Sequence, residues 1–141
     1  MAHSDLSAED WYAQSQRDLK AAEHLLAGGY FAHAAVLAHL SVEKVLKGWL
    51  RERSGSAPPP THDLQVLSTR LGLNRGAHGW TADLQAALDD LGDASILSLY
   101  RPERPFGHPV SGREDAARER VAAARTVGSW VQEASGPPAR S

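Results

Sequence analysis

The chain contains 141 residues, a length that suits one compact domain whose core needs no disulfide or structural metal. It has no cysteine, which excludes thiol catalysis, disulfide frameworks and cysteine-based zinc sites. Fifteen basic and seventeen acidic residues give a formal charge of −2, so net charge does not attract the chain to nucleic acid or to an anionic membrane. No apolar run approaches the roughly 20 residues of a membrane span, and residues 1–12 lack the pattern of a signal peptide. We therefore expect a cytoplasmic protein with no membrane partner.

Two long helices are predicted between Ala8 and Arg53. In residues 8–27, apolar or small side chains recur every three or four positions, with Ser7 and Asp10 resembling a capping box and Gly28-Gly29 as the stop. Residues 30–53 are apolar on several sides. A helix of that kind must contact more than one neighbour, so it is expected at the centre of the fold.

Two further helices are expected before residue 100. The Ser-Gly-Ser-Ala-Pro-Pro-Pro run at residues 54–60 predicts an exposed loop, because proline removes backbone donors. Thr61 is the predicted cap of a short third helix that ends at Gly72. The fourth helix is expected to start after Thr81 and to continue to Leu97 or Leu99, with leucines 84, 88 and 91 on one face.

Residues 100–109 contain three prolines and a glycine, which exclude a regular helix. Ser111 and Glu114 have the spacing of a second capping box, so the last helix is expected to open there. No segment alternates with period two for long enough to predict a strand. The predicted fold is all-α, an up-and-down bundle of four to five helices in a single domain over residues 8–134, between a tail at 1–7 and a disordered tail at 135–141.

The histidines and aspartates favour structural roles over a metal site. His39 and Glu43 share a helix face, but two candidate ligands do not make a metal site. His62 begins the third helix, where we expect its imidazole to bond a neighbouring backbone group. The aspartates near the fourth helix are expected to form a solvated face: Asp83, Asp89, Asp90 and Asp93. No metal and no cofactor are predicted.

The residues from Arg101 to Arg125 are the basic part of the chain, with six arginines against four acidic residues. Arginine suits phosphate because its planar fork donates two parallel hydrogen bonds and keeps its charge. His108 adds the one side chain that exchanges protons near neutral pH. The segment is therefore compatible with phosphodiester chemistry, although composition alone favours an arginine-rich surface loop.

Several motifs together resemble those of a prokaryotic HEPN domain. They are Ser41-Val42-Glu43-Lys44-Val45-Leu46-Lys47-Gly48-Trp49-Leu50, then Thr61-His62-Asp63-Leu64 after a proline-rich loop, and Tyr100-Arg101-Pro102 before the final helix. The pattern extends from about residue 8 to residue 133. The resemblance implies an all-α homodimer, of a kind often paired with a minimal nucleotidyltransferase as a toxin and its antitoxin.

The resemblance also implies two alternative activities. Some HEPN proteins are metal-independent ribonucleases with an Arg-x(4 to 6)-His motif, and Arg101 and His108 are separated by six residues here. In such proteins the histidine handles the 2′-hydroxyl proton and the arginine stabilises charge on the phosphorane, in a cleft between two protomers. Here Pro102 follows the arginine, where active proteins commonly have a polar residue. Other HEPN proteins do not cleave RNA.

The alternative that we place first is a module that binds a nucleotide, RNA or a partner protein. Its predicted phosphate- or nucleotide-binding residues are Arg101, Arg104, Lys47 and Glu43. The region of Glu43 and Lys47 often lies close to the cleft in HEPN proteins, although the two side chains also have the spacing of an intrahelical ion pair. A third interpretation is a helical scaffold that oligomerises through Trp11, Trp49 and Trp130.

Overall fold

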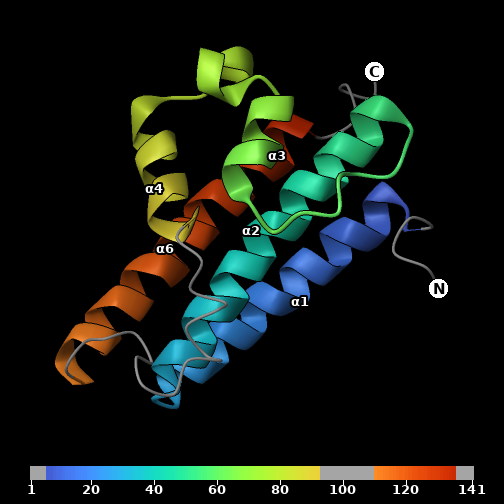
Figure 1. The fold of residues 1–141 in the computed structure, drawn as a ribbon. Coiled ribbons are helices and arrows are strands. Elements are labelled where there is room, and N and C mark those ends of the chain that lie inside the picture. The colour runs from blue at the N-terminus through green and yellow to red at the C-terminus, as the bar shows by residue number, and fades with distance from the viewer. Residues whose placement is uncertain (1–5, 93–109, 136–141) are drawn as a thin grey trace.

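The computed structural model describes residues 6–92 and 110–135, and these residues form an all-α fold in which no strand occurs. Figure 1 shows α1 and α2 side by side, with α3, α4 and α6 packed around them. The helices are α1 (Ala8–Ala27), α2 (Phe31–Ser54), α3 (Leu64–Arg70), α4 (Ala82–Gly92) and α6 (Val110–Ser135), with short 3-10 turns η2 (Leu73–Arg75) and η3 (Ala77–Gly79). The predicted all-α bundle is confirmed.

Local sequence signals define the α1–α2 hairpin. The Ser7 side chain accepts from the Asp10 amide, and the Asp10 carboxylate accepts from the Ser7 amide, so the predicted capping box is present. At the other end, Gly29 has φ of +85°, a backbone conformation that glycine adopts without strain. Both ends of α1 therefore lie where the sequence predicts them.

Small residues allow α1 and α2 to approach closely. The Ser15 hydroxyl donates to the Ser41 carbonyl at 2.7 Å, and the Ser41 hydroxyl donates to the Ser15 carbonyl at 3.0 Å. Nearer the end of α2, Gly48 lies under the ring of Tyr12. At the edge of this contact, Lys44 pairs with Asp18 at 2.7 Å.

The helix starts in the second half of the chain differ in part from the predictions. Asp63, not Thr61, is the N-cap of α3, and its carboxylate accepts from the Gln65 amide at 2.9 Å. Thr81 caps α4 as expected, by accepting from the Leu84 amide. The capping box predicted at Ser111 is wrong, because α6 begins at Val110 and Ser111 lies inside the helix. Asp93 and the predicted end of the fourth helix lie outside the described residues.

α2 is the central element of the core, as its composition predicts. It packs on α1 along one side and on α6 along the other, and α3 and α4 also contact it. The ring centroid of Trp49 on α2 lies 5.9 Å from that of Trp130 on α6, which in turn lies 5.2 Å from that of Trp80. The face of α6 that packs into the core is buried at Ala117, Val121, Ala124, Val127 and Val131.

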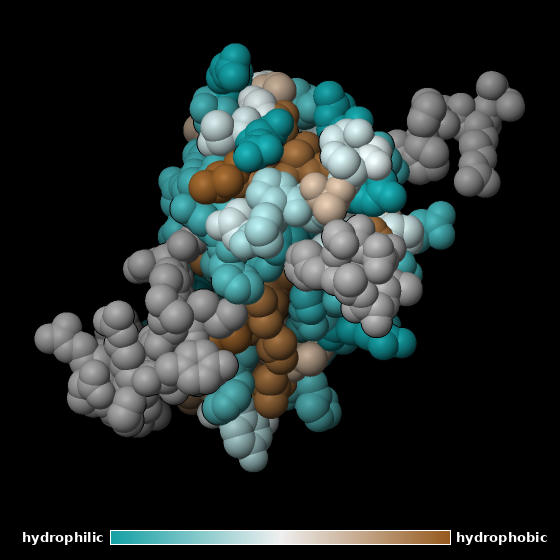
Figure 2. All heavy atoms as spheres, turned by 45° about the vertical axis from the view of Figure 1, so that its right-hand side comes forward, coloured by the Kyte–Doolittle hydropathy of each residue, from teal (hydrophilic) through white to brown (hydrophobic). Residues whose placement is uncertain are grey.

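The described surface is mainly hydrophilic, with a narrow hydrophobic strip visible between polar side chains (Figure 2). Among the described residues, the large hydrophobic side chains that are clearly exposed are Tyr30 and Val66. Asp83, Asp89 and Asp90 are exposed, as expected of a solvated face. Within residues 6–92 and 110–135, none of the helices has the length and apolar character to cross a membrane.

Candidate functional site

The predicted site residues divide into two groups. Arg101, Arg104 and His108 belong to residues 93–109, which lie outside the described residues, so their roles stay predictions. Glu43 and Lys47 are described, and both side chains are almost completely buried in α2. The geometry that follows concerns this buried pair and a pocket among the described residues that lies next to the same helix.

Glu43 and Lys47 form an ion pair one helical turn apart. The Lys47 ammonium donates to Glu43 Oε2 at 3.0 Å, with side chains only 1% and 4% exposed. The same ammonium lies 5.5 Å from the centroid of the Trp11 ring on α1, within the range of a cation–π contact. Both charges are thus engaged inside the protein, and the predicted intrahelical pair is present.

His62 joins this pair from the loop before α3. Its Nδ1 lies 2.9 Å from Glu43 Oε1, although 69% of the His62 side chain is exposed. We expected a bond from this imidazole to a neighbouring backbone group, and the structure shows a bond to a carboxylate 19 residues away instead. The buried Glu43 therefore holds the proline-rich loop against α2.

His39 connects three elements through its two ring nitrogens. Nδ1 lies 2.7 Å from the carbonyl oxygen of Leu91 in the last turn of α4, and Nε2 lies 3.0 Å from the carbonyl oxygen of His62. A carbonyl only accepts, so both bonds form together when both ring nitrogens carry a proton. Glu43 Oε1 lies 3.8 Å from Nε2 on the same helix face.

These four side chains, His39, Glu43, Lys47 and His62, constitute what we call the buried charged cluster. Glu43 accepts hydrogen bonds at both carboxylate oxygens, which offsets the cost of removing its charge from water. Lys47 and Glu43 are paired with each other and face away from solvent, so in this arrangement the cluster braces the fold. Among the described residues, no group of three or more His, Asp or Glu side chains is placed to hold a metal ion.

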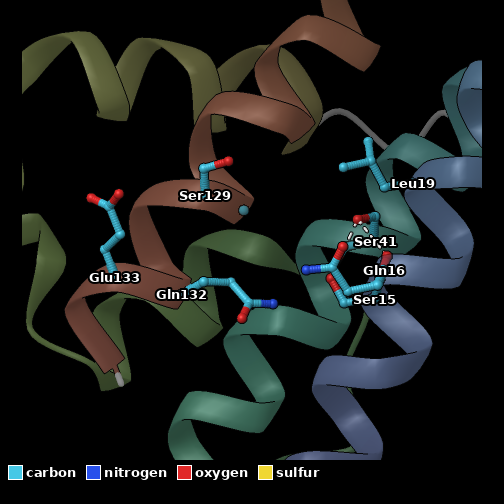
Figure 3. Close-up of a pocket in the computed structure, with 8 residues that line it drawn as sticks. Ser15, Gln16, Leu19, Ser41, Ser129, Gln132 and Glu133 are labelled. Atoms are coloured by element: carbon cyan, nitrogen blue, oxygen red, sulfur yellow. Dashed lines mark hydrogen bonds between the residues drawn. The ribbon is translucent and has the colours of Figure 1, made fainter. Parts of the chain in front are cut away.

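A half-open pocket of about 250 Å³ lies between α1, α2 and α6 (Figure 3). The bonded hydroxyls of Ser15 and Ser41 lie on one side of it. The other described lining residues are Gln16, Leu19, Gly128, Ser129, Gln132 and Glu133. In Figure 3 the amide groups of Gln16 and Gln132 extend toward the space between α1 and α6. Most of the residues that line the pocket are polar, and sequence analysis did not identify it.

Comparisons with known proteins identify the family of this chain. The sequence profile of the HEPN domain matches residues 8–134, which is most of the chain. This chain belongs to the HEPN family. Its fold is similar to the crystal structure of an archaeal HEPN homologue, with a TM-score of 0.68 and 26% sequence identity, over 91% of this chain and 97% of that one. Among curated proteins, none matches the chain.

Sequence analysis missed two parts of this HEPN domain, the charged cluster and the pocket. The cluster needed the approach of Leu91 and His62 to His39, which lie 52 and 23 residues from it. The pocket needed the relative placement of α1 and α6, which no local pattern specifies. The sequence does contain a signal for part of the cluster: His39, Glu43 and Lys47 recur every four residues, which places three polar side chains on one face of α2.

Proposed function

We propose that this HEPN protein is a homodimeric module that binds a nucleotide or a partner protein, as part of a toxin–antitoxin type pair with a minimal nucleotidyltransferase. Membership in the HEPN family supports the general class. The observation that favours a binding role is the half-open pocket between α1 and α6, whose two glutamine amides make no hydrogen bond to the described residues.

In this proposal Arg101 and Arg104 hold the phosphate groups, because the guanidinium fork donates paired hydrogen bonds to phosphate oxygens. Glu43 and Lys47 belong to the same predicted set of binding residues, and in the structure they are buried and bonded to each other. The proposal predicts that ATP binding weakens in Arg101→Ala and Arg104→Ala. It also predicts that binding is unchanged in Arg53→Ala, an exposed arginine at the end of α2.

A metal-independent ribonuclease is the second candidate, and the spacing of Arg101 and His108 favours it. His108 would accept the 2′-hydroxyl proton and Arg101 would stabilise charge on the phosphorane, with one pair from each protomer of a dimer. This activity needs no bound cofactor.

One experiment decides between the two candidates. Mixed cellular RNA is incubated in excess chelator with the native protein and with the Arg101→Ala, His108→Ala and Arg53→Ala variants. Cleavage by the native protein and Arg53→Ala alone identifies the ribonuclease and its two residues. RNA that stays intact in all four reactions, together with ATP binding by calorimetry and a dimer by light scattering, supports the binding module. Intact RNA and no ATP binding would contradict both candidates.

A further inference from the structure

The pocket between α1, α2 and α6 has side chains that are free to bind a ligand. The hydroxyl of Ser15 donates to the carbonyl of Ser41, and the hydroxyl of Ser41 donates to the carbonyl of Ser15. Gln16 on α1 and Gln132 on α6 make no hydrogen bond to the described residues. Each primary amide carries two N–H donors and one carbonyl acceptor. The two walls therefore present paired donors and acceptors across an open space (Figure 3).

The volume limits what fits between these walls. Pockets for drug-sized ligands measure about 300–1,000 Å³, whereas this one measures about 250 Å³. Gly128 contributes to the space, because a Cβ built at this position meets no heavy atom within 4 Å. The pocket therefore suits a single ring system and not a whole nucleotide.

The charge of the lining determines which part of a nucleotide it accepts. None of the described lining residues is Lys, Arg or His, and one of them, Glu133, is acidic. A phosphate group would meet a carboxylate and no cation, which disfavours it. A nucleobase is neutral, offers a flat face to Leu19, and carries adjacent donors and acceptors at its edge. Glutamine pairs with such an edge through two hydrogen bonds.

We propose that this pocket binds the base of a nucleotide, free or within RNA, and leaves its phosphate outside. The inference deepens the binding function proposed above and rests on it. It assigns base recognition to Gln16 and Gln132, residues distinct from the arginines proposed for phosphate. A neutral nucleoside should therefore shift the Gln16 and Gln132 amide signals as its monophosphate does, and salt should change the affinity of the nucleoside little. Few ligand atoms are enclosed, so the dissociation constant is expected on the order of 1 mM.

The test is a titration of the full-length, ¹⁵N-labelled protein with adenosine, cytidine, AMP and ribose 5-phosphate, followed by NMR. The side-chain amide signals of Gln16 and Gln132 should shift with at least one of the two nucleosides. AMP should shift the same two signals as adenosine, and ribose 5-phosphate should leave them unmoved. Two variants probe the site: Gly128→Leu fills the space, and Gln16→Leu removes one amide from an exposed position that does not endanger the fold. Gln14→Leu, on the same helix but outside the pocket lining, is the matched control.

Each result has a defined meaning. Affinity reduced about tenfold or more in Gln16→Leu and Gly128→Leu, with Gln14→Leu unchanged, supports the base pocket. If Gly128→Leu does not fold, Gln16→Leu alone decides. The inference is wrong if neither nucleoside shifts the two amides, or if ribose 5-phosphate shifts them. AMP binding that is lost in Arg101→Ala, with no shift of these amides, would retain the proposed function and refute the base pocket. No binding of any ligand would refute both.

Discussion

Replacement of Gly48 by alanine tests how closely α1 and α2 approach each other. A Cβ at this position would lie 2.6 Å from Cε1 and 2.8 Å from Cδ1 of Tyr12, and 3.1 Å from Cβ of Trp11. The Trp11 Cβ is attached directly to the α1 backbone, and the Tyr12 hydroxyl is 3.5 Å from the Glu52 carboxylate. Relief of the clash therefore requires α1 to move away from α2, which also strains the Ser15–Ser41 contacts.

Two opposing effects determine how much Gly48→Ala changes the free energy of unfolding. Overpacking in a core costs about 1–3 kcal/mol, and replacement of glycine by alanine inside a helix returns about 1 kcal/mol. We expect Gly48→Ala to lower the free energy of unfolding by about 1 kcal/mol. Gly128→Ala is the matched control, because it is also inside a helix and its Cβ meets nothing within 4 Å. It should raise the free energy of unfolding by up to about 1 kcal/mol.

Urea unfolding followed by circular dichroism measures both variants against the native protein. Both variants gain helix propensity from the change of glycine to alanine. The difference between their free energies of unfolding, about 1–3 kcal/mol, is therefore the cost of the clash at position 48. At about 4 °C per kcal/mol, the melting temperatures should differ by about 4–12 °C. If Gly48→Ala proves as stable as Gly128→Ala, with an unchanged urea dependence, then close approach of the helices is not what requires glycine at position 48.

Three further predictions concern buried charge, pH and capping. Glu43→Ala should lower the free energy of unfolding by about 3–5 kcal/mol, because Lys47 is left buried without its partner. Recovery of most of that loss in Glu43→Leu/Lys47→Met, measured by the same urea assay, would confirm the cause. A Glu43→Ala variant as stable as the native protein would contradict it. Burial, with a smaller contribution from Glu52, raises the pKa of Tyr12 to about 12 from its ordinary value of 10.0. Because the neutral phenol is favoured in the folded state, its contribution to stability is present below pH 10 and is lost as the pH rises toward 12. Between pH 9 and pH 11, the free energy of unfolding should fall less in Tyr12→Phe than in the native protein. An equal fall in both would refute the raised pKa of Tyr12. Ser7→Ala should cost about 1 kcal/mol in thermal unfolding, whereas a similar cost for the exposed Ser56→Ala would point to a cause other than the cap.

The contrast between α1 and α6 shows how well local sequence patterns predict the ends of a helix. Ser7, Asp10 and the Gly28-Gly29 pair define both ends of α1, since each acts through bonds to residues a few positions away. At α6 the same reasoning failed, because Ser111 has the spacing of a cap but the helix already begins at Val110. Capping spacing indicates that a helix starts nearby, but it does not fix the residue at which the helix begins.

The sequence by itself determined the all-α bundle, the central position of α2 and membership in the HEPN family, because helical periodicity, glycine stops and motif spacing are local properties of the chain. Only the tertiary structure decided which polar groups meet. His39 bonds the carbonyls of His62 and Leu91, and Gln16 lies across a pocket from Gln132, pairings that depend on how helices far apart in sequence pack together. Side-chain packing sets these distances, and no spacing within a single helix encodes them.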